Sequence, residues 1–98
     1  MKTDVSVINE ALSQNLSYLE KTYHVKKIGV FGSFSRGENT RSSDIDVLVE
    51  FSKPISMFRF IELEEFLSKT FGRKVDLVSK KALKPQLKEQ ILREVRYV

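Results

Sequence analysis

The sequence predicts an α+β fold, in which helices and short strands alternate along one chain. Apolar residues recur at three- and four-residue spacing in three segments, which is typical of helices with one buried face. Short runs rich in β-forming residues lie between those segments. The chain has 98 residues, of which 41% are hydrophobic, enough for one globular domain with a modest core. We therefore expect residues 1–98 to form a single domain.

The predicted elements follow the order helix, strand, strand, helix, strand, helix. The first helix has Thr3 or Asp4 available as its cap. Its predicted buried face comprises Val5, Ile8, Leu12, Leu16, Leu19 and Tyr23. Strands are predicted at 26–32, 45–51 and 74–79, where β-formers cluster.

Two further helices complete the prediction. After Pro54, helical spacing links Phe60, Leu63, Leu67 and Phe71, and Gly72 is a stop signal. The last helix is marked by Leu83, Leu87, Ile91, Val95 and Val98. Its Pro85 is tolerable only near the first turn, because proline lacks the backbone N–H that a helix interior requires.

The amino-acid composition limits the kinds of catalytic and metal sites that the protein can have. Cysteine is absent and histidine occurs only as His24, which excludes disulfides, thiolate zinc sites and histidine-based triads as the main chemistry. A metal ion would have to be held by oxygen. The net charge of +4 suits an anionic ligand or partner, although scattered surface lysines give the same count. No apolar run reaches the length of a signal peptide or a membrane span, so we expect a cytoplasmic protein.

Three aspartates stand where apolar residues would be ordinary. Asp44 and Asp46 are two positions apart at the start of a strand, so they project from the same face, with Ile45 and Val47 on the other. Asp76 lies between Val75 and Leu77 in the third strand. If the second and third strands are neighbours, the three carboxylates converge. Proteins keep such clusters ionised chiefly by placing hard cations among them, usually Mg²⁺. Two Mg²⁺ ions held by carboxylates commonly catalyse nucleophilic displacement at phosphorus, because they stabilise the attacking and leaving oxygens.

The residues before the acids suggest a phosphate-binding turn. A strand ends in Gly32 and Ser33, and the following residues can begin a short helix whose N–H groups face an anion. Gly32 has no side chain and so permits close approach of a phosphate. Ser33 adds a hydroxyl donor, and the guanidinium of Arg36 can donate several hydrogen bonds to the same phosphate. The stretch "GSFSRGEN" is no P-loop, because Glu38 and Asn39 stand where lysine and Ser/Thr are required. The dinucleotide fingerprint G-x-G-x-x-G is also missing.

Together these residues resemble the DNA polymerase β-like nucleotidyltransferase superfamily. The signature is Gly-Ser, ten residues, then Asp-x-Asp in "GSFSRGENTRSSDID", followed by a separate aspartate on a later strand. The length and the run "DIDVLVEF" are similar to those of the minimal nucleotidyltransferases (MNT), which are commonly paired with helical HEPN toxins. The resemblance covers roughly residues 26–96. Ser35 stands where alanine is frequent in these proteins. The resemblance implies a minimal nucleotidyltransferase fold, a short mixed β-sheet with helices packed on it.

The resemblance also implies roles for individual residues. Asp44 and Asp46 would ligate two Mg²⁺ ions, and Asp76 would ligate one of them and take the proton of the acceptor hydroxyl. Gly32, Ser33 and Arg36 would hold the triphosphate of ATP. The implied protein is the antitoxin of a HEPN/MNT module that transfers AMP to a tyrosine of the helical toxin and releases pyrophosphate. No membrane or nucleic-acid partner is expected.

Alternative interpretations remain open at this stage. The chain could transfer a nucleotide to a small molecule such as an aminoglycoside, or it could block a toxin by contact alone. Asp44 and Asp46 could be strand-edge acids, Asp76 could be a surface residue paired with Lys74, and Arg36 could be a solvated arginine. His24 is more simply an exposed or capping residue, and Gly29 and Gly37 are interpreted as structural. The segment "KKALKPQLKEQ" is most simply a solvated helix face, although it could also dock an acidic partner.

Overall fold

The computed structural model describes residues 4–98, so Thr3 lies outside the described part of the chain. The described chain contains α1 (Val5–Tyr23), β1 (Val25–Phe31), α2 (Ser33–Arg36), β2 (Ile45–Phe51), α3 (Met57–Phe71), β3 (Val75–Ser79), the short 3₁₀ helix η1 (Lys80–Ala82), α4 (Pro85–Glu94) and β4 (Arg96–Tyr97). The predicted order of helices and strands is confirmed up to α4, and β4 is an element that the sequence prediction lacked.

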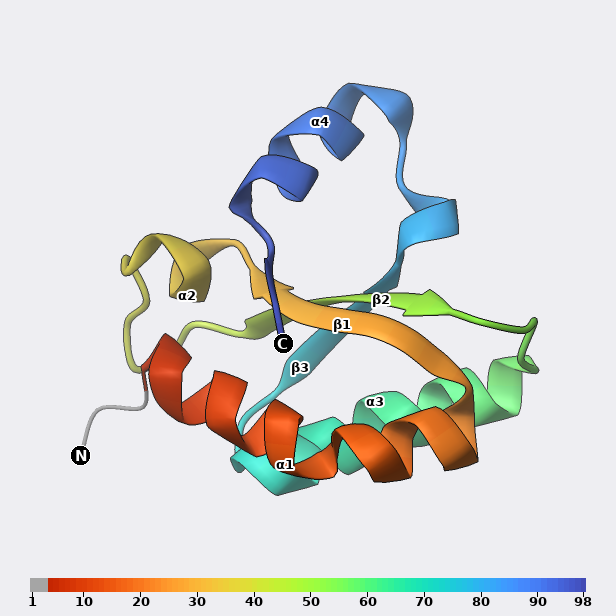
Figure 1. The fold of residues 1–98 in the computed structure, drawn as a ribbon. Helices are drawn as coiled ribbons and strands as arrows, with labels where there is room; N and C mark the ends of the chain where they lie inside the picture. Colours follow the sequence, from red (N-terminus) through yellow and green to blue (C-terminus); the bar gives the residue numbers. More distant parts are fainter. Residues whose placement is uncertain (1–3) are drawn as a thin grey trace.

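The strands form one mixed sheet in the order β3-β2-β1-β4. β1 pairs antiparallel with β2 and with β4, whereas β2 pairs parallel with β3. The predicted α+β class with a mixed sheet is therefore confirmed. A parallel pair needs a crossover between its strands, and α3 supplies it between β2 and β3 (Figure 1).

One face of the sheet packs on α1 and α3, which lie side by side beneath it in Figure 1. Asp4 caps α1, because its carboxylate accepts the backbone N–H groups of Ser6 and Val7 at 3.0 and 3.2 Å. The fully buried side chains of this core include Ile8, Leu12 and Leu19 from α1, Leu63 from α3, and Ile45, Val47 and Val49 from β2. The sequence prediction placed all of these residues on apolar faces.

The edge strand β3 is protected by side chains of α3. The hydroxyl of Ser68 accepts the Val75 N–H at 3.1 Å, and the carboxylate of Glu64 accepts the Leu77 N–H at 2.9 Å. An edge strand otherwise exposes such groups to pairing with other chains. These two bonds fix the position of β3, and therefore of Asp76 between them.

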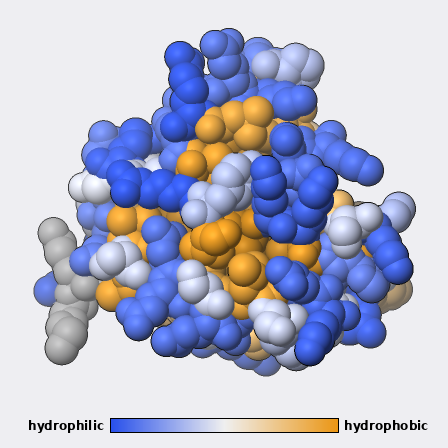
Figure 2. Space-filling view, in the orientation of Figure 1, coloured by the Kyte–Doolittle hydropathy of each residue, from blue (hydrophilic) through white to orange (hydrophobic). Residues whose placement is uncertain are grey.

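The opposite face of the sheet is covered only in part. α4 lies above it in Figure 1 and buries none of its residues, and Leu87 remains 48% exposed. Figure 2 shows hydrophobic surface beneath α4, framed by hydrophilic residues. No helix among residues 4–98 is long and apolar enough to cross a membrane.

The prediction for the C-terminal segment was wrong in its extent. Helical spacing suggested one helix from Leu83 to Val98, but α4 begins at Pro85 and ends at Glu94, and the chain then pairs with β1. Gly29 makes this pairing possible, because a Cβ there would collide with the backbone of Arg96 and Tyr97. Gly29 is thus structural, as predicted. Strand pairing overrides the helical pattern at the last residues.

His24 and Gly37 also have the structural roles that the sequence suggested. His24 is the C-cap of α1 with a left-handed φ of 57°. Gly37 is the C-cap of α2 with a φ of 72°, a conformation that glycine adopts without strain.

Candidate functional site

The three aspartates lie at the entrance to β2 and β3. Asp46 and Asp76 are direct register partners in the parallel pair, and Asp44 immediately precedes β2. Asp76 is exposed, and the Asp44 side chain is 41% exposed. β2 and β3 are therefore neighbours, the condition on which convergence of the three carboxylates depended.

The charges at this site influence one another. The pKa of Asp46 is raised above its ordinary value, first by burial and then by the negative charges of Asp76 and Asp44. The positive charge of Arg36 acts in the opposite direction, and Glu94 adds a further negative charge. Two parallel strands thus bring three carboxylates close enough to disfavour the ionised form of Asp46, as like charges do.

Lys74 pairs with Asp44, with 3.8 Å between Nζ and Oδ2. The alternative interpretation had paired Lys74 with Asp76, and the structure does not support that pairing. The Lys74 side chain is 72% exposed, so this ion pair is solvated and weak. It leaves Asp44 accessible for other contacts.

The loop before Asp44 is held in place by Arg73. The guanidinium of Arg73 donates to the backbone carbonyls of Thr40 and Ser43 at 3.0 and 2.9 Å. The same guanidinium lies over the ring of the buried Phe34, 5.4 Å from its centroid. Sequence analysis missed Arg73, because its contacts link it to residues 30 or more positions away. Arg73 fixes the direction in which the chain enters β2.

Gly32 lies directly against Asp46. Its φ is 75°, and a Cβ at this position would collide with the carboxylate of Asp46. Any larger residue would therefore be strained in its backbone and would displace Asp46. α2 consists of a single turn, Ser33–Arg36, so its dipole is small and the side chains carry most of any attraction for an anion.

Arg36 is an exposed arginine that forms ion pairs with two carboxylates. Its Nε pairs with Glu38 at 2.8 Å and its Nη1 pairs with Glu94 at 3.0 Å, while the side chain stays 42% exposed. These partners raise the pKa of Arg36, and the hydrogen bond that Arg36 donates to Glu38 contributes most. The alternative interpretation of Arg36 as a solvated arginine agrees with this exposure, although the residue also has two ion-pair partners.

Sequence analysis missed Glu94. The residue belongs to the last turn of α4, and the buried hydroxyl of Ser35 donates to its backbone carbonyl. Its side chain is only 17% exposed. The expected continuation of the helix to Val98 gave no reason to single out Glu94, and its partner Arg36 is 58 positions away.

The donor set fits a hard divalent cation in its chemistry. Three carboxylates offer only oxygen, which is what Mg²⁺ prefers, and their mutual repulsion at Asp46 would be relieved by a positive charge. Among residues 4–98, no three acidic or histidine side chains are already arranged closely enough to enclose a metal ion. Asp44, Asp46 and Asp76 would therefore have to draw together around a cation.

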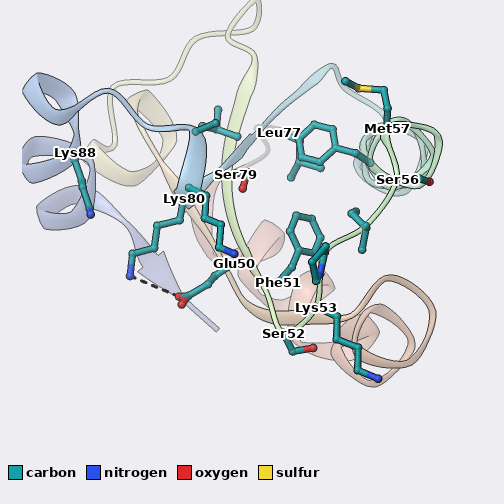
Figure 3. Close-up of a pocket in the computed structure, with 16 residues that line it drawn as sticks. Glu50, Phe51, Ser52, Lys53, Ser56, Met57, Leu77, Ser79, Lys80 and Lys88 are labelled. Atoms are coloured by element: carbon teal, nitrogen blue, oxygen red, sulfur yellow. Dashed lines mark ion pairs between the residues drawn. The ribbon is translucent and has the colours of Figure 1, made fainter.

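A cleft lies at the other ends of β2 and β3. It has a volume of about 780 Å³ and is lined by residues from β2, β3, η1 and both the start of α3 and the middle of α4. Figure 3 shows Phe51 and Leu77 beside it, together with the ion pair that joins Lys80 to Glu50 at 3.7 Å. None of the predicted site residues lines this cleft. The acids and the cleft are thus separate features.

Comparison with known proteins decides the family. The nucleotidyltransferase domain model matches residues 6–98. The chain belongs to the nucleotidyltransferase domain family. This nucleotidyltransferase is 45% identical over 91 residues to the protein adenylyltransferase MntA of Thermococcus cleftensis, a match that covers 93% of this chain and 92% of the relative. It is 46% identical over 99 residues, covering both chains completely, to a Methanocaldococcus jannaschii protein provisionally named a protein adenylyltransferase.

Solved structures agree with this assignment. A structure provisionally described as a minimal nucleotidyltransferase is 33% identical, with a TM-score of 0.82, and the match covers 96% of this chain and 95% of that one. A toxin–antitoxin complex with AMP-PNP is 26% identical, with a TM-score of 0.73, covering 87% of this nucleotidyltransferase and 69% of that chain. The predicted minimal nucleotidyltransferase fold and enzyme class are confirmed.

Proposed function

We propose that the protein transfers AMP from ATP to a tyrosine hydroxyl of a helical HEPN-type toxin, for which it is the antitoxin. The observation that carries this proposal is the position of Asp46 beside Asp76, Asp44 and Gly32 at the entrance of two parallel strands. The names of the relatives support the adenylyl group and the protein acceptor. The toxin–antitoxin structure with AMP-PNP supports the donor and the class of partner.

In the proposed reaction the acceptor oxygen attacks the α-phosphorus of ATP. A new P–O bond forms, the bond from the α-phosphorus to the bridging oxygen breaks, and pyrophosphate leaves. Asp76, the exposed member of the acid set, takes the proton of the hydroxyl. Positioning of the two reactants supplies much of the rate enhancement.

Asp44 and Asp46 would hold two Mg²⁺ ions, and Asp76 would share one of them. When bound, these ions supply charge neutralisation at the phosphates and polarise the attacking and leaving oxygens. Gly32, Ser33 and Arg36 would hold the triphosphate through the backbone, a hydroxyl and a guanidinium. The raised pKa of Asp46 is consistent with a carboxylate cluster that gains stability from a cation.

A protein partner is favoured over a small acceptor because the acid site is open. Asp76 and the side chains of Asp44 and Arg36 are all substantially exposed. A second chain would cover the site and exclude water from the reaction. The net charge of +4 also suits an acidic partner surface.

Labelled ATP tests the proposal. The protein is incubated with Mg²⁺, ATP labelled at the α-phosphate and a helical HEPN-type toxin, and the labelled product is digested for mass spectrometry. We expect an AMP adduct on a tyrosine of the partner. Label found only on small acceptors such as an aminoglycoside would contradict the protein acceptor, and the absence of any adduct would favour a module that acts by contact alone.

A further inference from the structure

Glu94 forms contacts through both its side chain and its backbone. Its carboxylate accepts from Arg36 at 3.0 Å and from Gln90 at 3.3 Å. Burial by itself would raise the pKa of Glu94, but hydrogen bonds from Gln90 and Arg36, the charge of Arg36 and the backbone amide of Gly32 together lower it. The carboxylate is therefore held as an anion beside Gly32 and Arg36.

The same two residues are those proposed to hold the triphosphate. A carboxylate and a phosphate oxygen are both anionic acceptors and compete for the same donors. Glu94 also adds negative charge near Asp46, since it is one of the groups that raise the pKa of Asp46. The negative charge of Glu94 would repel a triphosphate that approached Gly32 and Arg36.

We propose that Glu94 is an internal competitor for the phosphate-binding residues, so that its carboxylate must leave Arg36 before the triphosphate of ATP can bind there. The proposal rests on the proposed function only in assigning phosphate binding to Gly32 and Arg36. It makes Glu94 a residue that sets nucleotide affinity, although it has no role in the chemical step.

The anchoring of Glu94 permits such a displacement. Its backbone carbonyl is bound by the Ser35 hydroxyl, and the following residues Arg96 and Tyr97 pair with β1. These contacts do not involve the carboxylate. The side chain can therefore leave Arg36 while the end of α4 stays in place. α4 buries none of its residues, so its packing does not oppose local adjustment.

The test compares the wild type with Glu94→Gln, which removes the charge and preserves the shape. Titration calorimetry with AMP-PNP and with inorganic tripolyphosphate, each with Mg²⁺, measures the affinity. We expect Glu94→Gln to bind both ligands about three- to tenfold more tightly, since the ligand no longer breaks a partly exposed ion pair. The gain should be equal for the two ligands, because the competition concerns phosphate alone.

Glu89→Gln is the matched control, because Glu89 is an exposed acid of the same helix. It should leave both affinities unchanged, which separates the contact with Arg36 from the general charge of α4. A thermal melt verifies that both variants are folded.

Affinity that is equal or weaker in Glu94→Gln would overturn the proposal and would make Glu94 a residue that positions Arg36. Tripolyphosphate that binds neither protein would overturn it together with the phosphate-binding role of Gly32 and Arg36. An affinity gain without any AMP transfer to a partner would leave the competition intact and refute the proposed function instead.

Discussion

The two faces of the sheet differ in what they bury. The face toward α1 and α3 is lined by fully buried apolar side chains such as Leu12, Val47 and Leu63. The face toward α4 carries Asp46, Asp76 and Glu50 along β2 and β3 beside the buried Leu48. α4 lies over this face in Figure 1 and buries none of its residues. Burial of apolar area is the dominant stabilising term in folding, so most of the stability must come from the first face.

This difference follows from alternation along β2. Ile45, Val47 and Val49 point into the core, and Asp46 points to the other side. One strand can therefore stabilise the fold and present a charged group without conflict. We infer that substitutions on the two faces should separate, with large losses of stability from the face toward α1 and α3 and losses of nucleotide chemistry from the face toward α4.

The largest expected effect is on the polar face, the sheet face toward α4 that carries Asp46, Asp76 and Glu50. Asp76→Asn should lower AMP transfer by about 10²- to 10⁴-fold, because the proposed proton acceptor is lost. Its stability should change by no more than about 0.5 kcal/mol, since the residue is exposed. Single-turnover transfer and a urea melt measure the two quantities. Glu65→Gln, an exposed acid on α3, is the control, and an equal loss of transfer in it would refute the assignment of Asp76.

On the apolar face, the sheet face that packs on α1 and α3, a substitution should lower stability and leave nucleotide affinity nearly unchanged. Leu63→Ala removes a fully buried side chain and should lower the free energy of unfolding by about 2–5 kcal/mol through lost burial and the remaining cavity. Nucleotide affinity of the folded fraction should stay within twofold, on the order of 0.4 kcal/mol. Chemical denaturation and calorimetry well below the melting temperature check this. A large loss of affinity would show that the two faces are coupled.

A smaller effect is expected for Arg36→Ala. Loss of a charge-assisted contact to phosphate, about 1.5–3 kcal/mol, should weaken ATP binding by roughly one to two orders of magnitude. The fold should persist, because the side chain is 42% exposed and its ion pairs are partly solvated. Arg93→Ala, an exposed arginine of α4, should leave affinity unchanged. Unaltered affinity in Arg36→Ala would remove it from the proposed site.

Much of the apolar face could be predicted from sequence. The periodic residues of α1 and α3 are buried, and the β-rich runs form β1, β2 and β3. These elements have strong local signals, since spacing alone identifies a helix face and a strand. The same method failed at Val95 and Val98, which continue a helical pattern but follow α4. Pairing of β4 with β1 is a long-range interaction that the sequence did not predict, because Gly29 was interpreted only as structural.

The polar face was predicted less completely for a physical reason. Asp44 and Asp46 share one local motif, so their spacing was informative. Glu94 and Arg73 act through contacts to residues far away in the chain, and such contacts have no period in the sequence. The parallel pairing that aligns Asp76 with Asp46 also depends on the crossover through α3. From the sequence alone, convergence of the three carboxylates could be predicted only on the assumption that the second and third strands are neighbours.

The most direct test of the account is a thermal melt of the wild type and Asp46→Asn. Each is measured without metal and with Mg²⁺ and AMP-PNP. Burial and the negative charges of Asp76 and Asp44 disfavour the ionised form of Asp46, so we expect Asp46→Asn to melt a few degrees higher without metal. Saturating ligand at 100 times Kd should stabilise the wild type by about 2.7 kcal/mol, and most of that increase should vanish in the variant. Equal ligand-induced shifts in both proteins would contradict the assignment of the acid site.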